Sequence, residues 1–275
     1  MSLKAVAKET IKILESGQYT NNSGQIVNFA EEQKKAERET KLYTPEQLQK
    51  LLSQSNSNSG NQLLIEVVEE RTQTAAHRLI TSEECSDLVL LNFASARNPG
   101  GGFINGAKAQ EEDLARCSGL YLCLLKQPKY YQMNREQKSL IYTDHIIYAP
   151  QIPWFRTHRR KFLDNYFVAS VITAPAPNAG QILRRDSNAQ PRILEALQRR
   201  AGYVLTVARD NRHRNLLLGA WGCGVFRNNP LDVAGAFAGW LNSPEFQGCF
   251  DRVVFAIYDS TKEKMVLSAF KNYFE

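Results

Sequence analysis

The sequence predicts an α/β sandwich, built on a largely parallel or mixed β-sheet. From residue 62 onward, short apolar runs alternate with amphipathic helical stretches, which is typical of chains that cover a sheet with helices. The run DLVLLNFA at 87–94 is apolar almost throughout, as expected for a strand buried on both faces. Glycine-rich loops follow two of the predicted strands, at 100–102 and at 219–224. In an open α/β sheet, ligands bind beyond the carboxyl ends of the strands, so these loops predict one binding cleft.

The remaining elements follow the same alternation. We expect further strands at 63–69, 146–150, 168–174, 215–221 and 252–259. We expect helices at 72–80, 111–127, 192–210, 233–241 and 262–274. No internal repeat is visible, which excludes a solenoid.

The first sixty residues have a different character. An amphipathic helix is expected to end at Gly17, and residues 29–40 are charge-rich and predict a short exposed helix. Thr44 and Pro45 fit the N-cap and first turn of a helix that runs to about Ser53. The polar stretch 53–61 predicts a loop or linker. We therefore divide the chain into a helical extension, residues 1–60, and an α/β domain, residues 61–275.

Composition limits the class of protein. The chain has 275 residues, of which 43% are hydrophobic, so it can bury a sizeable core. A net charge of +6 suits an anionic partner but is modest for an obligate nucleic-acid binder. Without a secretory h-region or a membrane-length apolar window, we expect a soluble cytoplasmic protein with no membrane partner.

Cysteine and histidine spacing argues against a metal site. The five cysteines are scattered, with no CxxC pair, which favours reduced thiols over a disulfide framework or a zinc cage; they are Cys85, Cys117, Cys123, Cys223 and Cys249. The four histidines also lack ligand spacing. We expect no metal and no cofactor, and we assign no histidine a catalytic role.

The first glycine-rich loop leads into a pair of carboxylates. Gly100, Gly101 and Gly102 allow positive φ and a close approach of the backbone to a ligand, although a flexible turn would show the same pattern. Glu111 and Glu112 then stand where the next helix begins. Such carboxylates often do no more than complement the helix dipole, but a like-charged neighbour also makes one carboxyl hold its proton, as a general acid requires.

The second loop is a candidate phosphate-binding loop. Gly222 and Gly224 alternate with larger residues after an apolar strand, a pattern that exposes successive N–H groups. No motif links Cys223 to a histidine, so we do not expect a nucleophilic cysteine. Two basic clusters, at 156–161 and 209–214, could contact a polyanion or be solvated surface.

Together these motifs resemble one enzyme family. Three glycines, seven residues and then Gln110-Glu111-Glu112, followed later by Gly-Ala-Trp-Gly-Cys-Gly-Val-Phe at 219–226, resemble the signature of the bacterial-type poly(ADP-ribose) glycohydrolases. The resemblance implies a macrodomain-like three-layer α/β/α sandwich with a mixed sheet and an N-terminal helical extension. It implies hydrolysis of the ribose–ribose bonds of poly(ADP-ribose), with ADP-ribose as the product.

The resemblance also implies roles for single residues. Glu112 would protonate the leaving ribose hydroxyl and then deprotonate the attacking water, and Glu111 would hydrogen-bond the ribose hydroxyls. The substrate-binding residues would be Asn98, Gly100, Gly101, Gly102, Gln110, Gly222, Cys223, Gly224, Val225 and Phe226. The backbone of the second loop would hold the diphosphate, and Phe226 would position the terminal ribose.

Other functions remain open at this point. A non-catalytic ADP-ribose reader would need neither Glu111 nor Glu112. A hydrolase that acts on single ADP-ribose groups of modified proteins would use the same cleft, so the partner is either poly(ADP-ribose) or an ADP-ribosylated protein. A nucleic-acid-binding module is disfavoured, because the basic clusters lack interleaved aromatic residues.

Overall fold

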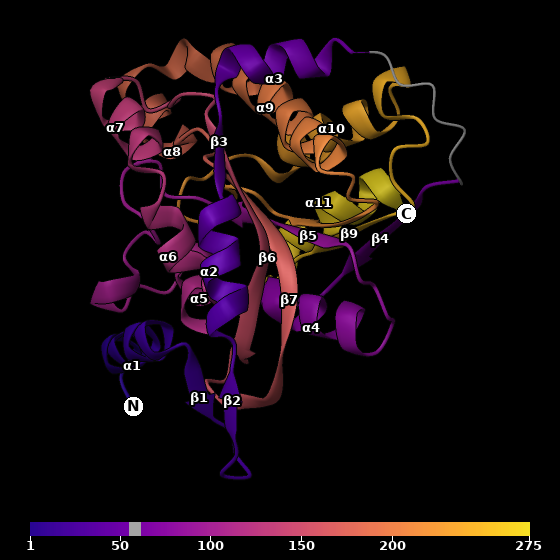
Figure 1. The fold of residues 1–275 in the computed structure, drawn as a ribbon. Helices are drawn as coiled ribbons and strands as arrows, with labels where there is room; N and C mark the ends of the chain where they lie inside the picture. Colours follow the sequence, from indigo (N-terminus) through magenta and orange to yellow (C-terminus); the bar gives the residue numbers. More distant parts are fainter. Residues whose placement is uncertain (55–61) are drawn as a thin grey trace.

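The computed structural model describes residues 1–54 and 62–275. A seven-stranded sheet with the strand order β3-β6-β7-β5-β8-β9-β4 runs through the molecule, and helices cover both of its faces (Figure 1). The strands of this sheet are β3 Lys41–Tyr43, β4 Leu64–Val68, β5 Leu88–Phe93, β6 Ile146–Arg156, β7 Phe162–Ala174, β8 Asn215–Gly219 and β9 Arg252–Ala256. A separate hairpin consists of β1 Gln18–Thr20 and β2 Ile26–Asn28.

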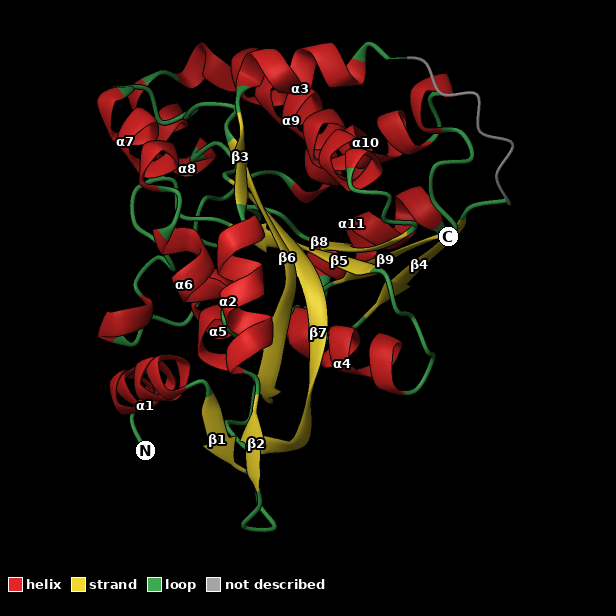
Figure 2. Ribbon diagram, viewed as in Figure 1, coloured by secondary structure: helices red, strands yellow, loops and turns green. Residues whose placement is uncertain are grey.

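The helices alternate with these strands along the chain (Figure 2). They are α1 Leu3–Ser16, α2 Ala30–Glu39, α3 Pro45–Leu52, α4 Thr72–Thr81, α5 Gln110–Cys117, α6 Leu120–Leu125, α7 Pro128–Glu136, α8 Ala179–Arg185, α9 Gln190–Asp210, α10 Pro230–Leu241 and α11 Met265–Phe274. Short 3₁₀ turns are η1 Phe103–Asn105, η2 Ser187–Ala189 and η3 Pro244–Phe246. None of the helices in the described ranges is long and apolar enough to cross a membrane.

The sheet is mixed, and its core separates into two layers. Strands β7, β5, β8, β9 and β4 pair in parallel, whereas β6 and β3 are antiparallel to their neighbours. Along β5, Val89 and Leu91 join the core under α3, α9, α10 and α11, while Leu88 and Leu90 join the core under α2, α4, α5 and α6. This alternation is the period of two that a strand imposes. The predicted α/β/α sandwich with a mixed sheet is confirmed.

Local capping explains where two of the predicted helices begin and end. Gly17, at φ 67°, closes α1 with a left-handed residue whose N–H donates to Ile13 O. Thr44 accepts from Gln47 N, and the Gln47 side chain accepts from Thr44 N in return, which is a capping box. Most of the predicted loop at 53–61 lies outside the described residues.

The predicted helix at 111–127 is wrong as a single element. The structure divides it into α5 and α6, because Ser118 is extended (φ −148°, ψ 176°) and bridges to Trp154 of β6. Gly119 N then donates to Pro153 O at 2.9 Å. The apolar periodicity continues across this break, so only the pairing with a distant strand reveals it.

Strands β6 and β7 are much longer than the predicted 146–150 and 168–174. Beyond the sheet they continue as a two-stranded ribbon, in which Ile152 pairs with Ala169 and Arg156 with Phe162. The charged and proline residues of this ribbon obscure its strand character in the sequence. The predicted strands at 215–221 and 252–259 are shorter in the structure, because the chain leaves the sheet at Gly219 and Ala256.

The first sixty residues are not helical alone. They contribute β3 to the edge of the main sheet, where Leu42 pairs with Ile147 of β6, and they form the β1–β2 hairpin. The N-terminus of α1 approaches the turn at Gly106, between η1 and α5: a Cβ at Gly106 would lie 2.9 Å from Lys4 N. The division of the chain at residue 60 remains a prediction.

Candidate active site

The site is built at the carboxyl ends of two neighbouring parallel strands. The pairing of β5 with β8 stops at Leu90–Leu217, before either strand ends. The chain after β5 passes through α5–α7 on one face of the sheet, and the chain after β7 passes through α9 on the other face before it enters β8. The carboxyl end of β5 therefore lies at a point where the connections change sides, which is where open α/β sheets bind ligands.

The backbone of the first glycine-rich loop packs directly against the Glu111 and Glu112 carboxylates. Gly100 and Gly101 have φ values of 66° and 57°, which favour glycine. A Cβ at Gly101 would lie 2.4 Å from Glu112 Oε1 and 3.2 Å from Glu111 Oε2. Gly102 N donates to Glu112 Oε1 at 2.8 Å. No side chain can replace the hydrogen at Gly101 without moving the carboxylate pair.

Glu111 is held on both of its oxygens. It is 2% exposed, its Oε1 accepts from Asn92 Nδ2 at 3.2 Å, and its Oε2 accepts from Ser95 N at 2.6 Å. Burial is the main cause that raises the pKa of Glu111 to about 8; the nearby charge of Glu112 adds to it, while the bonds from Ser95 and Asn92 oppose it. Burial therefore favours the protonated form of Glu111.

Glu112 has one oxygen that the fold does not use. The residue is 7% exposed, and Oε1 is held by Gly102 N, but the buried Oε2 has no hydrogen-bond partner among the described residues. Buried polar atoms without a partner are uncommon in folded proteins and often mark a functional site. Among the unpartnered buried atoms of the described residues, this oxygen is the carboxylate oxygen at the glycine-rich loop.

Gln110 ties the start of α5 to β5. Its Oε1 accepts from Phe93 N at 2.8 Å, and its Nε2 donates to Leu91 O at 2.9 Å. The side chain thus fixes the helix that carries both glutamates, and its contact with substrate stays a prediction. Asn98 is exposed, and only its backbone is used, by Ser95 Oγ and Gly101 N.

The second loop leaves three successive N–H groups available. Gly224, Val225 and Phe226 donate no backbone hydrogen bond within the part of the chain that the structure describes. A Cβ at Gly224 would meet no atom within 4 Å, and Val225 is 78% exposed. Gly222, at φ 73°, packs against Asn228, whose Nδ2 would lie 2.4 Å from its Cβ. The loop is anchored at Gly222 and open at Gly224.

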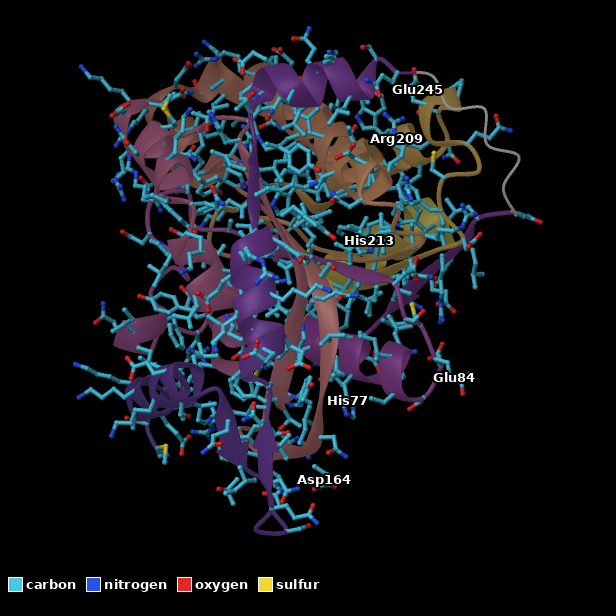
Figure 3. The ribbon with its side chains drawn as sticks, viewed as in Figure 1. His77, Glu84, Asp164, Arg209, His213 and Glu245 are labelled. Atoms are coloured by element: carbon cyan, nitrogen blue, oxygen red, sulfur yellow. The ribbon has the colours of Figure 1, made fainter. Side chains whose placement is uncertain are left out.

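The side chains of this loop also have definite places. Phe226 is half-buried, with its ring 6.1 Å from that of Tyr142. Burial raises the pKa of Cys223 to about 12, so its thiol stays protonated and does not act as a nucleophile. His213, labelled in Figure 3, lies just before β8, at the amino end of that strand and away from the second loop. Its Nε2 contacts the Tyr148 hydroxyl at 2.8 Å.

Sequence reasoning missed several residues of this edge. Asn92 and Ser95 hold Glu111; Asn92 is the single polar residue in the apolar run of β5, which is a signal the sequence does contain. Tyr258 and Arg71 follow the ends of β9 and β4, and the Arg71 guanidinium lies 3.5 Å from the centroid of the Tyr258 ring. No local sequence pattern predicts the contact between Arg71 and Tyr258, because these residues lie far apart in the chain.

A seven-stranded mixed sheet with two buried glutamates at its switch point defines a macrodomain-like enzyme. The family model of the microbial-type PARG catalytic domain, where PARG is poly(ADP-ribose) glycohydrolase, matches residues 7–157. The chain is also 43% identical to the PARG structure from Thermomonospora curvata, with 99% of both chains covered and a TM-score of 0.94. The PARG of Deinococcus radiodurans in complex with ADP-ribose is 43% identical, with 88% of this chain and 96% of that chain covered and a TM-score of 0.82.

A third similar structure is the Thermomonospora curvata enzyme bound to the inhibitor ADP-HPD, at 43% identity, 98% coverage of both chains and a TM-score of 0.90. None of the curated proteins compared with the chain gives a significant match. The chain belongs to the microbial-type poly(ADP-ribose) glycohydrolases. It is a hydrolase of the glycosidase class with poly(ADP-ribose) glycohydrolase function.

Proposed function

We propose that the enzyme binds the terminal ADP-ribose of poly(ADP-ribose) across the ends of β5 and β8 and releases it with Glu112 as the acid/base. The observation that carries this proposal is the unpartnered, buried Glu112 Oε2. Glu111, two of whose acceptor positions are already occupied, instead organises the loop from Ser95 onward. Similar structures that hold ADP-ribose or the inhibitor ADP-HPD support a ligand of this kind.

The chemistry requires one group that acts twice. Glu112 Oε2 donates a proton to the leaving ribose hydroxyl as the glycosidic C–O bond breaks. Water then adds to the same carbon, and Glu112 takes the proton that the water loses, so the carboxyl returns to its starting state. One carboxylate in both roles departs from the usual pair of glycosidase carboxylates.

Glu111 supports this step by position. Its contacts with Asn92 and Ser95 fix the loop beside the acid. Carboxylate oxygens accept more than one hydrogen bond, so a ribose hydroxyl can still donate to Glu111. The ribose contact therefore remains part of the proposal.

The second loop binds the diphosphate. The free N–H groups of Gly224, Val225 and Phe226 form an anion-binding surface at the end of β8, one strand from the carboxylates. Phosphate oxygens held there place negative charge near the cationic transition state, which lowers its free energy. Phe226 packs beside the terminal ribose.

The adenine lies farther along the same edge. Neighbouring strands are about 4.8 Å apart, so a ligand with its ribose at β5 and its diphosphate at β8 reaches β9 and β4 with its base. Tyr258 is 55% exposed there and already stacks on Arg71, which makes it a suitable platform for a planar base. We assign the adenine contact to this pair.

The cellular setting is also part of the proposal. Cys85, Cys117, Cys123 and Cys223 are free thiols, which supports a reducing compartment such as the cytoplasm. Within the described residues, no group of three or more His, Cys, Asp or Glu side chains is placed to hold a metal ion. The substrate partner is poly(ADP-ribose), and its product is ADP-ribose.

The experiment is incubation of the purified enzyme with labelled poly(ADP-ribose) and, separately, with a singly ADP-ribosylated protein. We expect release of ADP-ribose from the polymer at a rate that EDTA does not change. Release from the singly modified protein alone would replace the polymer with that substrate. Strong inhibition by EDTA, reversed by a divalent ion, would contradict the metal-free mechanism.

A further inference from the structure

A cavity of about 250 Å³ lies between α4 and the β6–β7 ribbon, away from the two glycine loops. His77, on α4, is among its lining residues, and Figure 3 shows this side chain beside the ribbon. Four cationic or titratable side chains of the ribbon also line the cavity, Arg156, His158, Arg159 and Lys161, and no carboxylate does. The described structure gives this cluster no role in the reaction.

One of these cations is buried and incompletely bonded. The Arg156 side chain is 0% exposed, and its Nη2 pairs with Glu9 at 2.8 Å. Its Nε is buried without a hydrogen-bond partner among the described residues. This guanidinium lies in the wall of the cavity as a buried cation, which adds to the positive potential that an anion in the cavity would meet.

Two further cations stand at the surface of the cavity. Arg159 and Lys161 are exposed, and neither has an ion-pair partner within residues 1–54 and 62–275. Thr157 N and Lys161 O hold the turn between them with a 2.9 Å hydrogen bond. The turn thus presents two unneutralised charges beside the buried one.

Three of the remaining lining residues carry rings, Trp154, Phe167 and His77, beside Gln73, Thr74, Thr157 and Leu163. Phe167 lies parallel to Trp154, with ring centroids 5.9 Å apart and an interplanar angle of 4°. The His77 ring lies 5.6 Å from Phe167. A wall of flat rings beside a set of cations fits a planar base that carries a phosphate.

The other basic cluster, residues 209–214, provides a contrast, because two of its arginines form contacts within the protein. Arg209 donates to Glu245 O at 2.9 Å, and both residues lie together in Figure 3. Arg214 pairs with Asp251 at 2.6 Å. These cations hold the chain together, whereas Arg159 and Lys161 make no comparable contact.

The cavity adjoins the active site through α5. Gln73 lines the cavity and donates to Asp113 Oδ2 at 2.9 Å, and Asp113 follows Glu112 in the sequence. Arg156 Nη1 donates to Arg116 O, on the second turn of the same helix, at 3.0 Å. The two sites therefore lie on either side of one short helix.

We propose that this cavity binds a nucleoside phosphate, with the base against Phe167 and His77 and the phosphate against Arg159 and Lys161. Its natural occupant is a further ADP-ribose unit of the polymer, held while another unit occupies the active site. This assignment of the occupant rests on the proposed function. The proposal that the cavity binds a nucleoside phosphate is independent of it.

The first test locates the nucleotide by photo-crosslinking. The wild-type protein is irradiated with 8-azido-AMP, and labelled peptides are mapped by mass spectrometry. We expect label on α4 and on residues 154–167, with AMP competing more strongly than inorganic phosphate or adenosine. Label restricted to the ends of β5, β8, β9 and β4 would overturn the proposal, as would equal competition by phosphate alone.

Charge reversal provides the matched comparison. Arg159→Glu with Lys161→Glu should lower labelling of the cavity by about tenfold or more, the effect of losing a charge-assisted contact. Arg38→Glu with Lys50→Glu, two exposed cations away from the cavity, should leave it unchanged. Thr74→Phe, which places a ring in the cavity, should abolish the label. Labelling that persists in both cavity variants would contradict the site.

The second test identifies the source of the nucleotide. With long poly(ADP-ribose), the Arg159→Glu/Lys161→Glu variant should show a KM raised about tenfold, an unchanged kcat and unchanged affinity for ADP-ribose. An unchanged KM together with cavity labelling would mean that free nucleotide, not polymer, is the ligand. If the wild-type enzyme cleaves no polymer but is still labelled in the cavity, the proposed function fails and the nucleotide site stands.

Discussion

The two glycine-rich loops need their glycines for different reasons. At Gly101 the protein itself leaves no room, because a Cβ would lie 2.4 Å from Glu112 Oε1. At Gly224 a Cβ would meet nothing within 4 Å, so the fold would accept a side chain there. The first loop is shaped by the carboxylates beneath it, whereas at Gly224 the second loop leaves room for the ligand that we propose.

This difference separates the two parts of the reaction. The first loop positions the acid, and its integrity is coupled to folding through the Gly102 N–Glu112 Oε1 and Ser95 N–Glu111 Oε2 bonds. In the proposed function, the second loop binds the substrate diphosphate through N–H groups that donate no hydrogen bond within the described residues. Substitutions in the two loops should therefore affect different measurements.

The largest effect on stability is expected for Gly101→Ala. The added Cβ meets the carboxylate pair and forces a positive φ on alanine, so unfolding free energy should fall by about 2–4 kcal/mol and turnover should be lost. Gly24→Ala is the control, because Gly24 has φ 80° but open space around its Cβ. Chemical denaturation of both variants separates the effect of the steric clash from that of backbone strain. Equal losses of unfolding free energy in the two variants would show that backbone strain alone matters at Gly101.

Gly224→Val should leave stability unchanged and weaken ADP-ribose binding by about a hundredfold, since the side chain covers N–H groups that would bind phosphate. Calorimetric titration measures the affinity, and thermal melting verifies the fold. Gly239→Ala, at an exposed glycine with equal open space on α10, should bind ADP-ribose normally. Wild-type affinity in a folded Gly224→Val protein would remove the second loop from the binding site.

Stability should also depend on pH through Glu111. Its pKa is raised from 4.5 to about 8, so between these values the folded state binds more protons than the unfolded state. The free energy of unfolding should therefore fall as pH rises through this window, by about 1.4 kcal/mol for each pH unit. Glu111→Gln should lose this part of the slope, measured by urea denaturation at several pH values. An identical slope in the variant would place the proton elsewhere.

Much of the fold could be predicted because the strands and helices carry local patterns. The apolar run of β5 and the cap at Thr44 specify those elements without tertiary information. The break at Ser118 and the long β6–β7 ribbon could not be predicted, because both depend on pairing between distant segments. β3 was missed for the same reason: three residues form a strand only because β6 is beside them.

The site was predictable where its residues are close in sequence. The spacing from Gly100 to Glu112 places the loop and its carboxylates together, as the structure shows at Gly102 N and Glu112 Oε1. The sequence indicates that one of two adjacent carboxyls holds its proton more tightly but not which one; in the structure, burial raises the pKa of Glu111, the more deeply buried of the two. Burial of a single side chain is not visible in a pattern of adjacent residues.

The most direct test of the account is the turnover of Glu112→Gln on poly(ADP-ribose). Glutamine keeps the hydrogen bond from Gly102 N but cannot deliver a proton, so turnover should fall by about ten-thousand-fold while ADP-ribose affinity stays within about threefold. Glu46→Gln, an exposed carboxylate in the first turn of α3, should behave as wild type. Turnover of Glu112→Gln within about tenfold of wild type would show that Glu112 only complements the dipole of α5 and that the acid lies elsewhere.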